Sequence, residues 1–464
     1  MSNTRRGFIG AVAGLAVASG MASQTRRAAL PKGRVSPLDG VTRENIKIKD
    51  LRLISLGYRL KPEEEWPDGG NGNVIWKTES VIVEVSTDAG LKGIGAASRY
   101  NGPAGMKVYL EQVVKPALVG RNPFDVEHLS GGIAAGGPRG VWAGVDVALW
   151  DIIGKAKGLP LYKILATDTE PVTRIRAYAS AGEFTWHKGS RFPGPEQVLK
   201  EVRAFKAAGY TAYKFRMGAA FERFASIKDW IPYLRELRRL AGPDFHLIQE
   251  SNQRWSLEQC LEIAPVIEEI KALWWEEPMR KNIDNYLTLK KALPTVKISG
   301  GETVATRNEL VEWMDSGAYD VVQPGVDDAG LTECWHQARM AHVRGKLICP
   351  HNWQDNLVAV ANAHLMAAVP NRHYLESNMT PNPLKEGLFK EWWGVKDGYF
   401  TVPEKPGLGV ELKEGIEEMY PPVPGPWNIP DPAMPPAPAG AKPTGGGGAT
   451  QGLPWPSRPG QGLR

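Results

Sequence analysis

Three glutamates stand at equal intervals in the middle of the chain, each at the end of a short apolar run. They are Glu250 in HLIQESNQ, Glu276 in LWWEEP and Glu302 in KISGGET, 26 residues apart in each step. One strand, one helix and two loops need about that many residues, so the spacing predicts successive β/α units. The strands of a parallel barrel all end on one face, where these carboxylates would converge. Converging carboxylates need a cation, so the pattern favours a metal site over isolated surface charges or helix caps.

Other strand-like runs also end near residues that could do chemistry. They are AYKFR with Lys214 and Arg216, YDVVQP with Asp320, KLICPHN with His351 and HYLES with Glu376. Amphipathic helical patterns, such as SLEQCLEIAPVIEEI, lie between the runs. Together with a first strand near residues 175–178, these seven ends predict a (β/α) barrel.

The region before the barrel has a different rhythm. Residues 46–98 alternate apolar and polar side chains, which predicts antiparallel strands around a polar, glycine-rich loop at 61–73. A helical pattern follows from Val141 to Leu165 and is interrupted at Gly158-Leu159-Pro160. Much later, residues 395–410 have strand and turn character, and we expect them to return to this first domain.

The two ends of the chain differ from the rest. Residues 1–22 carry a twin arginine before an apolar run that is too short to span a bilayer. This pattern predicts a twin-arginine export leader and a periplasmic or exported protein, with a frayed tail or an anchor as the alternative. Residues 421–464 are rich in proline and glycine, and we expect them to be disordered. The net charge of +5 does not favour a nucleic acid or a membrane surface as partner.

The ordered set of motifs resembles the mandelate racemase branch of the enolase superfamily, within the mandelate racemase/muconate lactonizing enzyme family. The matching motifs are AGVDVALWDIIGKAKGLPLYKIL, KFR, ESNQRW, WWEEP, GGET, PHN and YLES. The resemblance implies an α/β fold, a modified (β/α)7β TIM barrel with an α+β capping domain made from both chain ends. The expected parts are a capping domain at 44–170, the barrel at 171–385 and a return segment at 386–420. Relatives commonly form homo-oligomers, dimers or octamers.

The resemblance also implies a site that removes the proton next to the carboxylate of a small-molecule substrate. Glu250, Glu276 and Glu302 match the ligands of one divalent cation, usually Mg2+, that stabilises the resulting charge. Relatives usually have aspartate in place of Glu250, so Asn252 is an alternative ligand or substrate contact. Tyr58 and Trp66, in and beside the polar loop, are expected near the substrate, unless that loop is a merely solvated hairpin.

Two further residues match an acid–base pair. His351 matches the general base, and Asp320 matches the partner that fixes its tautomer and supports its charged form. The alternative for His351 is a buried histidine bonded to a carbonyl. Glu376 matches an acid that hydrogen-bonds the substrate carboxylate, with a strand-end salt bridge as the alternative.

Lys214 and Arg216 replace the Lys-x-Lys pair of many relatives. Arginine stays protonated, which weakens a two-base racemase interpretation. Both cations are expected to hold the substrate carboxylate, or to pair with Glu250 or Glu276.

The stretch QPGVDDAGLTE followed by PHN resembles acid-sugar dehydratases, and it lacks the lysine of muconate-converting or dipeptide-epimerising relatives. The leading hypothesis is a Mg2+-dependent dehydratase of an aldonate or aldarate. His351 would take the proton from C2, and loss of the C3 hydroxyl would give a 2-keto-3-deoxy acid. The alternatives are a racemase or epimerase of a 2-hydroxy acid, a barrel glycosidase with paired carboxylates, and a non-catalytic binding protein.

Overall fold

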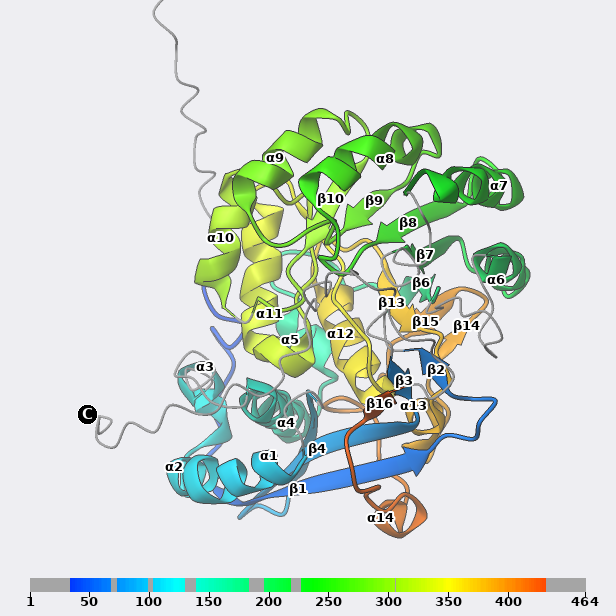
Figure 1. Cartoon of the computed structure of the whole chain (residues 1–464). Helices are drawn as coiled ribbons and strands as arrows, with labels where there is room; N and C mark the ends of the chain where they lie inside the picture. Colours follow the sequence, from blue (N-terminus) through cyan, green and yellow to red (C-terminus); the bar gives the residue numbers. More distant parts are fainter. Residues whose placement is uncertain are drawn as a thin grey trace, which may run out of the picture.

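The computed structural model describes residues 34–67, 73–98, 103–129, 139–182, 196–217, 227–304 and 306–430. The predicted leader, residues 68–72 of the polar loop and the tail beyond residue 430 lie outside these residues. Figure 1 shows a barrel with a capping domain below it, in which the long strands β1 and β4 cross the lower part of the view. No helix in the described segments is long and apolar enough to cross a membrane.

The barrel consists of parallel strands that alternate with helices. In the described residues its eight strands are β6 (Arg174–Ser180), β7 (Ala212–Arg216), β8 (His246–Glu250), β9 (Trp274–Glu276), β10 (Lys297–Gly300), β11 (Val321–Val322), β12 (Leu347–Ile348) and β13 (Leu375–Asn378). Neighbours pair in chain order from β6 to β12, and β13 pairs with β6. A bridge between Ile348 and Arg372 joins β12 to the segment before β13.

Seven helices lie between these strands in the same described residues. They are α6 (Glu196–Ala207), α7 (Ile231–Ala241), α8 (Leu257–Glu269), α9 (Ile283–Lys291), α10 (Arg307–Asp315), α11 (Val326–His342) and α12 (Asn356–Ala368), with a short 3-10 turn η6 (Ile227–Trp230) before α7. Local sequence sets the boundaries: the side chains of Ser256 and Gln259 form a capping box at the start of α8. The predicted (β/α)7β barrel is confirmed.

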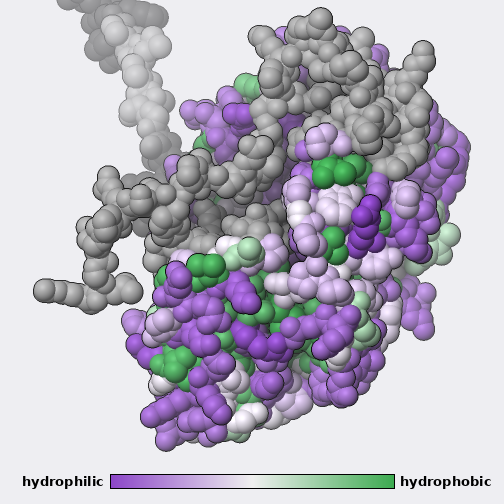
Figure 2. Space-filling view, turned by 60° about the horizontal axis from the view of Figure 1, so that its bottom comes forward, coloured by the Kyte–Doolittle hydropathy of each residue, from purple (hydrophilic) through white to green (hydrophobic). Residues whose placement is uncertain are grey.

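The capping domain is built on a three-stranded antiparallel sheet in the order β1 (Ile48–Arg59), β4 (Lys77–Thr87) and β5 (Lys92–Ala97). The long helix α4 (Arg139–Lys157) lies directly on it. A β-carbon on Gly95 would lie 2.1 Å from the carbonyl oxygen of Gly144, so the close approach requires glycine. The remaining short helices are α1 (Pro103–Tyr109), η2 (Leu110–Val114), α2 (Lys115–Leu118), η3 (Pro123–Asp125), α3 (Val126–Leu129) and α5 (Leu161–Leu165). The face turned forward in Figure 2 is mostly hydrophilic, with scattered hydrophobic patches.

The return segment contacts both the capping domain and the barrel, beginning with α13 (Pro383–Gly387) against β1 and β4. After α13, strands β14 (Val395–Lys396) and β15 (Tyr399–Thr401) form a hairpin, and β15 pairs antiparallel with β6. Further along the chain, the backbone nitrogen of Leu408 donates to Asp151 of α4, at 2.8 Å. The short helix α14 (Ile416–Met419) follows. The expectation that residues 395–410 return to the first domain therefore holds only for their last part.

A second, smaller sheet changes the interpretation of the tail. It has the order β16 (Asn428–Pro430), β3 (Asn73–Ile75) and β2 (Trp66–Pro67), all antiparallel. Residues 421–430 are therefore ordered, and the prediction that disorder begins at residue 421 is wrong. Proline-rich composition was a poor guide here because the strand is short and lies at a sheet edge, where proline is tolerated.

Two buried aspartates and their partners connect the capping domain to the barrel. Asp355 caps α12 by accepting from Leu357 N at 2.9 Å, and it also accepts from the hydroxyl of Ser80 on β4. Asp146 on α4 accepts from Thr332 N of α11 at 2.9 Å. Buried carboxylates that accept several hydrogen bonds fix geometry strongly. The capping domain is thus held over the carboxyl ends of the barrel strands.

Candidate active site

A buried cluster of ion pairs lies at the carboxyl ends of the strands. Lys214 Nζ donates to Glu250 Oε2 at 3.2 Å and to Glu276 Oε1, and it lies 2.9 Å from Glu376 Oε1. The four side chains come from β7, β8, β9 and β13 and are at most 2% exposed. The predicted convergence of these strand ends is confirmed. The pairing predicted as an alternative for Lys214, with Glu250 and Glu276, is present.

Burial and charge act in opposite directions within this cluster. Burial lowers the pKa of Lys214, but Glu276, Glu376 and Glu250 outweigh it and raise that pKa well above its usual value. Burial and then the charge of Glu276 raise the pKa of Glu250 well above its usual range. Burial also opposes ionisation of Glu276, yet Lys214 and the hydrogen bonds from Glu250 and Gln323 bring its pKa to about 2. Lys214 is therefore a permanent cation beside an ionised Glu276.

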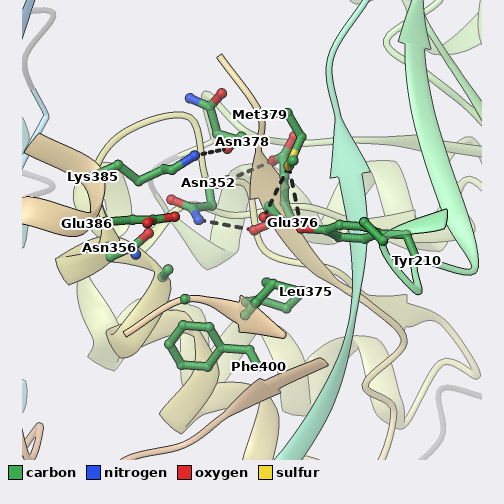
Figure 3. Close-up of a pocket in the computed structure, with 15 residues that line it drawn as sticks. Tyr210, Asn352, Asn356, Leu375, Glu376, Asn378, Met379, Lys385, Glu386 and Phe400 are labelled. Atoms are coloured by element: carbon green, nitrogen blue, oxygen red, sulfur yellow. Dashed lines mark hydrogen bonds between the residues drawn. The ribbon is translucent and has the colours of Figure 1, made fainter. Parts of the chain in front are cut away.

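Glu376 is held from two sides. Besides Lys214, its Oε2 accepts from the backbone nitrogen of Asn352 at 2.8 Å, and its carbonyl accepts from Asn352 Nδ2 at 3.1 Å. Both residues line a cavity of about 200 Å³, and Figure 3 shows the hydrogen bonds between them. The cavity lies between β13 and the return segment, where Lys385 donates to the carbonyl of Asn378 at 2.8 Å. Glu376 thus joins the loop after β12 to the ion-pair cluster.

His351 lies three residues beyond the end of β12, at the rim of the cluster. Its Nε2 lies 3.4 Å from Glu302 Oε2, and the two side chains are 13% and 22% exposed. Its own backbone is fixed, because its nitrogen donates to Pro324 O at 3.2 Å and its carbonyl accepts from Asn362 Nδ2 at 2.9 Å. Burial and the charge of Glu276 raise the pKa of Glu302 to about 7. The imidazole therefore faces a carboxylate and not a main-chain carbonyl.

Asp320 does not lie beside His351. Its carboxylate contacts Lys290 Nζ at 2.5 Å and Lys346 Nζ at 3.5 Å, and it accepts from Ile298 N at 3.1 Å. It precedes β11, so it lies at the amino ends of the strands, on the opposite side of the barrel from His351. The prediction that Asp320 orients the imidazole is wrong, because that strand begins one residue later.

Asp327, which the sequence analysis did not select, is a second carboxylate close to His351, near its Nδ1. A β-carbon on Gly325 would lie 2.7 Å from Asp327 Oδ1 and 3.7 Å from His351 Nδ1, so the three groups share one small space. Asp327 is 2% exposed, and its Oδ2 accepts from Gln354 Nε2. Burial and Asp328 raise the pKa of Asp327 to about 7, against the opposing effect of His351. The motif QPGVDDAG marks this turn in the sequence, but only the fold brings it beside PHN.

Arg216 lies further from the carboxylates than Lys214 does. It donates through Nη1 to Ala181 O at 2.9 Å, and its Cζ lies 4.0 Å from the ring centroid of Trp353. Trp353 in turn packs edge to face on Trp66, with ring centroids 6.2 Å apart. Trp66 therefore reaches the barrel through Trp353.

Tyr58 lies within β1, where its ring packs against the ring of Tyr420, with centroids 6.4 Å apart. Tyr58 also packs against the buried cluster that contains Trp66 and Trp353.

Asn252 and Glu277 lie beyond the ends of their strands, and both have positive φ angles, 47° and 41°. Strand alternation therefore does not place Asn252 on the same side as Glu250; instead its backbone nitrogen donates to Glu250 Oε1 at 2.7 Å. Glu277 accepts from Gln253 Nε2 at 2.8 Å. Burial and Glu302 raise the pKa of Glu277 to about 8. Both residues shape the turns that carry the acidic cluster.

The donor chemistry fits a hard divalent cation. Glu250, Glu276 and Glu302 supply carboxylate oxygens from three neighbouring strand ends, and such cations prefer oxygen ligands. In the present arrangement Lys214 supplies the positive charge between Glu250 and Glu276. Among the described residues, no three acidic, histidine or cysteine side chains are close enough to bind one ion as they stand.

A capped (β/α)7β barrel with acidic strand ends and a histidine at its mouth defines a class of barrel enzymes. The family described as "Enolase C-terminal domain-like" matches residues 197–416, and the "Mandelate racemase / muconate lactonizing enzyme, N-terminal domain" matches residues 73–166. The chain belongs to the enolase superfamily, in its mandelate racemase/muconate lactonizing enzyme family. It is therefore an enzyme of that superfamily, whose members typically bind Mg2+.

Individual relatives cover most of the chain. An arabinonate dehydratase of Saccharolobus solfataricus is 29% identical over 80% of this chain and 99% of its own length. A D-galactarolactone cycloisomerase of Agrobacterium fabrum is 27% identical over 82% of this chain and 100% of its own. The crystal structure of an enolase superfamily member from Polaromonas sp. JS666 is 30% identical, with a TM-score of 0.72 over 82% of this chain and 99% of that one.

Proposed function

We propose that this protein is a Mg2+-dependent dehydratase of a sugar acid, an aldonate or an aldarate, and makes a 2-keto-3-deoxy acid. The observation that carries the proposal is the position of His351, whose Nε2 faces Glu302 at the barrel mouth while its Nδ1 side faces Asp327. The arabinonate dehydratase among the relatives supports the reaction class. The particular sugar acid is left to experiment.

The base would be Nε2 of His351. With its hydrogen on Nδ1, on the side of the ring near Gly325, His351 would keep a lone pair on Nε2, which lies 3.4 Å from Glu302 Oε2. A substrate whose carboxylate lies beside Glu302 would present its C2 hydrogen to that lone pair. Because the backbone of His351 is held by Pro324 and Asn362, the ring would not need to be repositioned.

Glu250, Glu276 and Glu302 would hold Mg2+, which, when bound, neutralises charge that develops on the substrate carboxylate. Lys214 remains protonated and supplies a second, fixed positive charge at the same place. Glu376 is buried and anchored by Asn352, so it holds Lys214 in position. These residues would therefore bind and orient the acid group without taking its proton.

Loss of water would complete the reaction. Removal of the C2 proton by His351 leaves an enediolate, whose electrons form the C2–C3 double bond as the C3–O bond breaks. The protonated imidazole then gives its proton to the departing hydroxyl, which leaves as water. The enol product becomes the 2-keto-3-deoxy acid. His351 serves as both base and acid, since Asn252, two residues beyond Glu250, cannot donate a proton as an acid.

A second candidate is an isomerisation that begins with the same proton removal. The cycloisomerase among the relatives favours it. A two-base racemase has less support, because the guanidinium of Arg216 is stacked on Trp353 and bonded to Ala181. The two candidates differ in product: only the dehydratase releases a 2-keto-3-deoxy acid.

The test is incubation of the full chain with Mg2+ and a library of aldonic and aldaric acids in D2O. We expect a 2-keto-3-deoxy acid from at least one library member, and loss of product after chelation. Exchange of deuterium into C2 without keto acid would favour isomerisation or racemisation instead. If no library member gives either a keto acid or deuterium exchange at C2, the proposal is refuted.

The matched variants are His351→Asn and His342→Asn. His351→Asn should remove both product formation and C2 exchange. His342 is exposed on α11, so the same substitution there should leave activity unchanged.

A further inference from the structure

Residues 421–430, here called the C-terminal strap, are anchored to the capping domain by a fully buried lysine. Lys77 is 1% exposed, and its Nζ donates to Val423 O at 2.7 Å, to Gly425 O at 2.6 Å and to Glu79 at 2.8 Å. A buried ammonium group needs hydrogen-bond acceptors, because burying it without these hydrogen bonds costs free energy. Two of the three acceptors come from the strap, so the strap completes the folded capping domain.

Further contacts fix the strap in register. Trp76 Nε1 donates to Pro426 O at 2.8 Å. Strand β16 then pairs with β3, with Asn428 opposite Ile75, and Figure 1 shows β16 beside β3 and β2. A β-carbon on Gly57 would lie 2.6 Å from Val423 N, so the strap lies directly against the backbone of β1.

The strap ends on an aromatic cluster that reaches the active site. Trp427 packs against the buried cluster of Leu60, Trp66, Ile75 and Trp353. Trp66 is on β2, Ile75 is on β3, and Trp353 is in the barrel loop that carries His351. With Trp427, the cluster therefore joins residues 60–75, the loop at Trp353 and the strap, which are far apart in the sequence, and only the loop belongs to the barrel.

Trp353 connects this aromatic cluster to the active site. Its ring lies 4.0 Å from Arg216 Cζ, and its neighbour Asn352 donates its backbone N–H to Glu376. His351 precedes Asn352 directly. A shift of Trp353 would thus move the loop on which the proposed base stands, and misplacement of a catalytic group by about 1 Å can cost on the order of a hundredfold in rate.

We infer that the C-terminal strap is a positioning element of the active site: through Trp427 and Trp66 it holds Trp353, and with it the His351 loop and the Arg216 side chain. The kinetic part of this inference rests on the proposed function. The structural part does not, since it concerns the order of the loop in the substrate-free protein. Trp427 is a positioning residue and touches no reacting atom.

The experiment compares full-length Trp427→Ala and Trp427→Phe with the wild type. Backbone hydrogen exchange, measured without substrate, should rise in Trp427→Ala both at residues 73–77 and at residues 351–354. Trp427→Phe keeps an aromatic ring and should restore protection at both places. Trp392→Ala is the matched control, because Trp392 is 55% exposed and its indole donates to Glu386 at 3.0 Å, outside the cluster.

Kinetics provide the second measurement. With a turned-over sugar acid, Trp427→Ala should lower kcat about tenfold or more, and Trp427→Phe should recover most of it. Unchanged exchange at 351–354 in Trp427→Ala would overturn the inference, even if the strap itself loosened. If the wild type turns over no sugar acid, the proposed function fails, while the exchange result still decides the role of the strap. Should Trp427→Ala not fold, Trp427→Leu, which keeps more apolar volume, replaces it in both measurements.

Discussion

Gly325 and Asp327 are complementary: a side chain on Gly325 would occupy the space that the Asp327 carboxylate takes beside His351. The β-carbon would lie 2.7 Å from Asp327 Oδ1, which is closer than such contacts are found. That oxygen is buried and has no hydrogen-bond partner among the described residues. Oδ2 is held by Gln354, so the carboxylate keeps a fixed orientation with its other oxygen toward the imidazole side.

Asp327→Asn should lower kcat about a hundredfold, because the amide no longer supports the charged form of His351. The pH dependence of kcat should change as well. Loss of a residue that only supports packing would leave that pH dependence as it is in the wild type. Asp244→Asn, at an exposed position before β8, is the control. Equal activity of Asp327→Asn and wild type would remove Asp327 from the proposed mechanism.

Gly325→Ala tests the same relationship from the other side. The added methyl group must displace the Asp327 carboxylate, so activity should fall although no reacting group is changed. Thermal unfolding measured in parallel separates this effect from a general loss of stability. Activity equal to that of the wild type would show that the carboxylate has room elsewhere.

The barrel and its acidic strand ends were predictable because strand and helix lengths repeat. The 26-residue interval correctly placed Glu250 and Glu276 at the last positions of β8 and β9, with Glu302 two residues beyond β10. Helix α4 also ended as predicted, since Gly158 adopts a positive φ of 65°. Such features depend on local pattern, which a sequence displays directly.

The features that could not be predicted depend on exact strand boundaries and on contacts between residues that only the fold brings together. Asp320 was misplaced because β11 has only two residues, so a shift of one or two positions exchanges the two ends of the barrel. Asp327 was missed because only the folded turn reveals that Gly325 leaves it room. The order of the strap depends on Lys77, which is 346 residues from Val423.

Mg2+ should stabilise the protein if the three glutamates bind it. At a concentration 100 times the dissociation constant, the free energy of unfolding should rise by about 2.7 kcal/mol. Glu276→Gln should abolish this increase, because it removes the ionised central carboxylate. Glu258→Gln, on the exposed surface of α8, should leave it intact. An equal Mg2+ effect in Glu276→Gln and the wild type would place the ion elsewhere.

Lys214→Met should destabilise the metal-free protein by roughly 3–5 kcal/mol, because Glu250, Glu276 and Glu376 then lose the ammonium group that pairs with all three. Added Mg2+ should recover part of the loss. Lys200→Met, on the exposed face of α6, should change stability by no more than about 0.5 kcal/mol. Urea denaturation with and without Mg2+ measures both effects. A small loss of stability in Lys214→Met would mean that the carboxylates bind protons once the lysine ammonium group is removed.

His364, a buried residue of α12 far in sequence from its partners, should make a destabilising contribution in mild acid. Its Nδ1 accepts from Tyr162 N at 3.2 Å, and its Nε2 donates to Leu408 O at 3.0 Å, so a second ring proton would face an N–H group. Burial lowers the pKa of His364 to about 4, against about 6.5 in the unfolded chain. Between those values the unfolded chain binds a proton that the folded protein does not. The contribution of this residue to stability is therefore lost as pH falls from about 6.5 toward 4, by about 3 kcal/mol.

In His364→Gln, urea denaturation should show a smaller loss of unfolding free energy from pH 7 to pH 5 than in the wild type, while His342→Gln should match the wild type. Identical differences in His364→Gln and the wild type would assign the acid sensitivity to other groups.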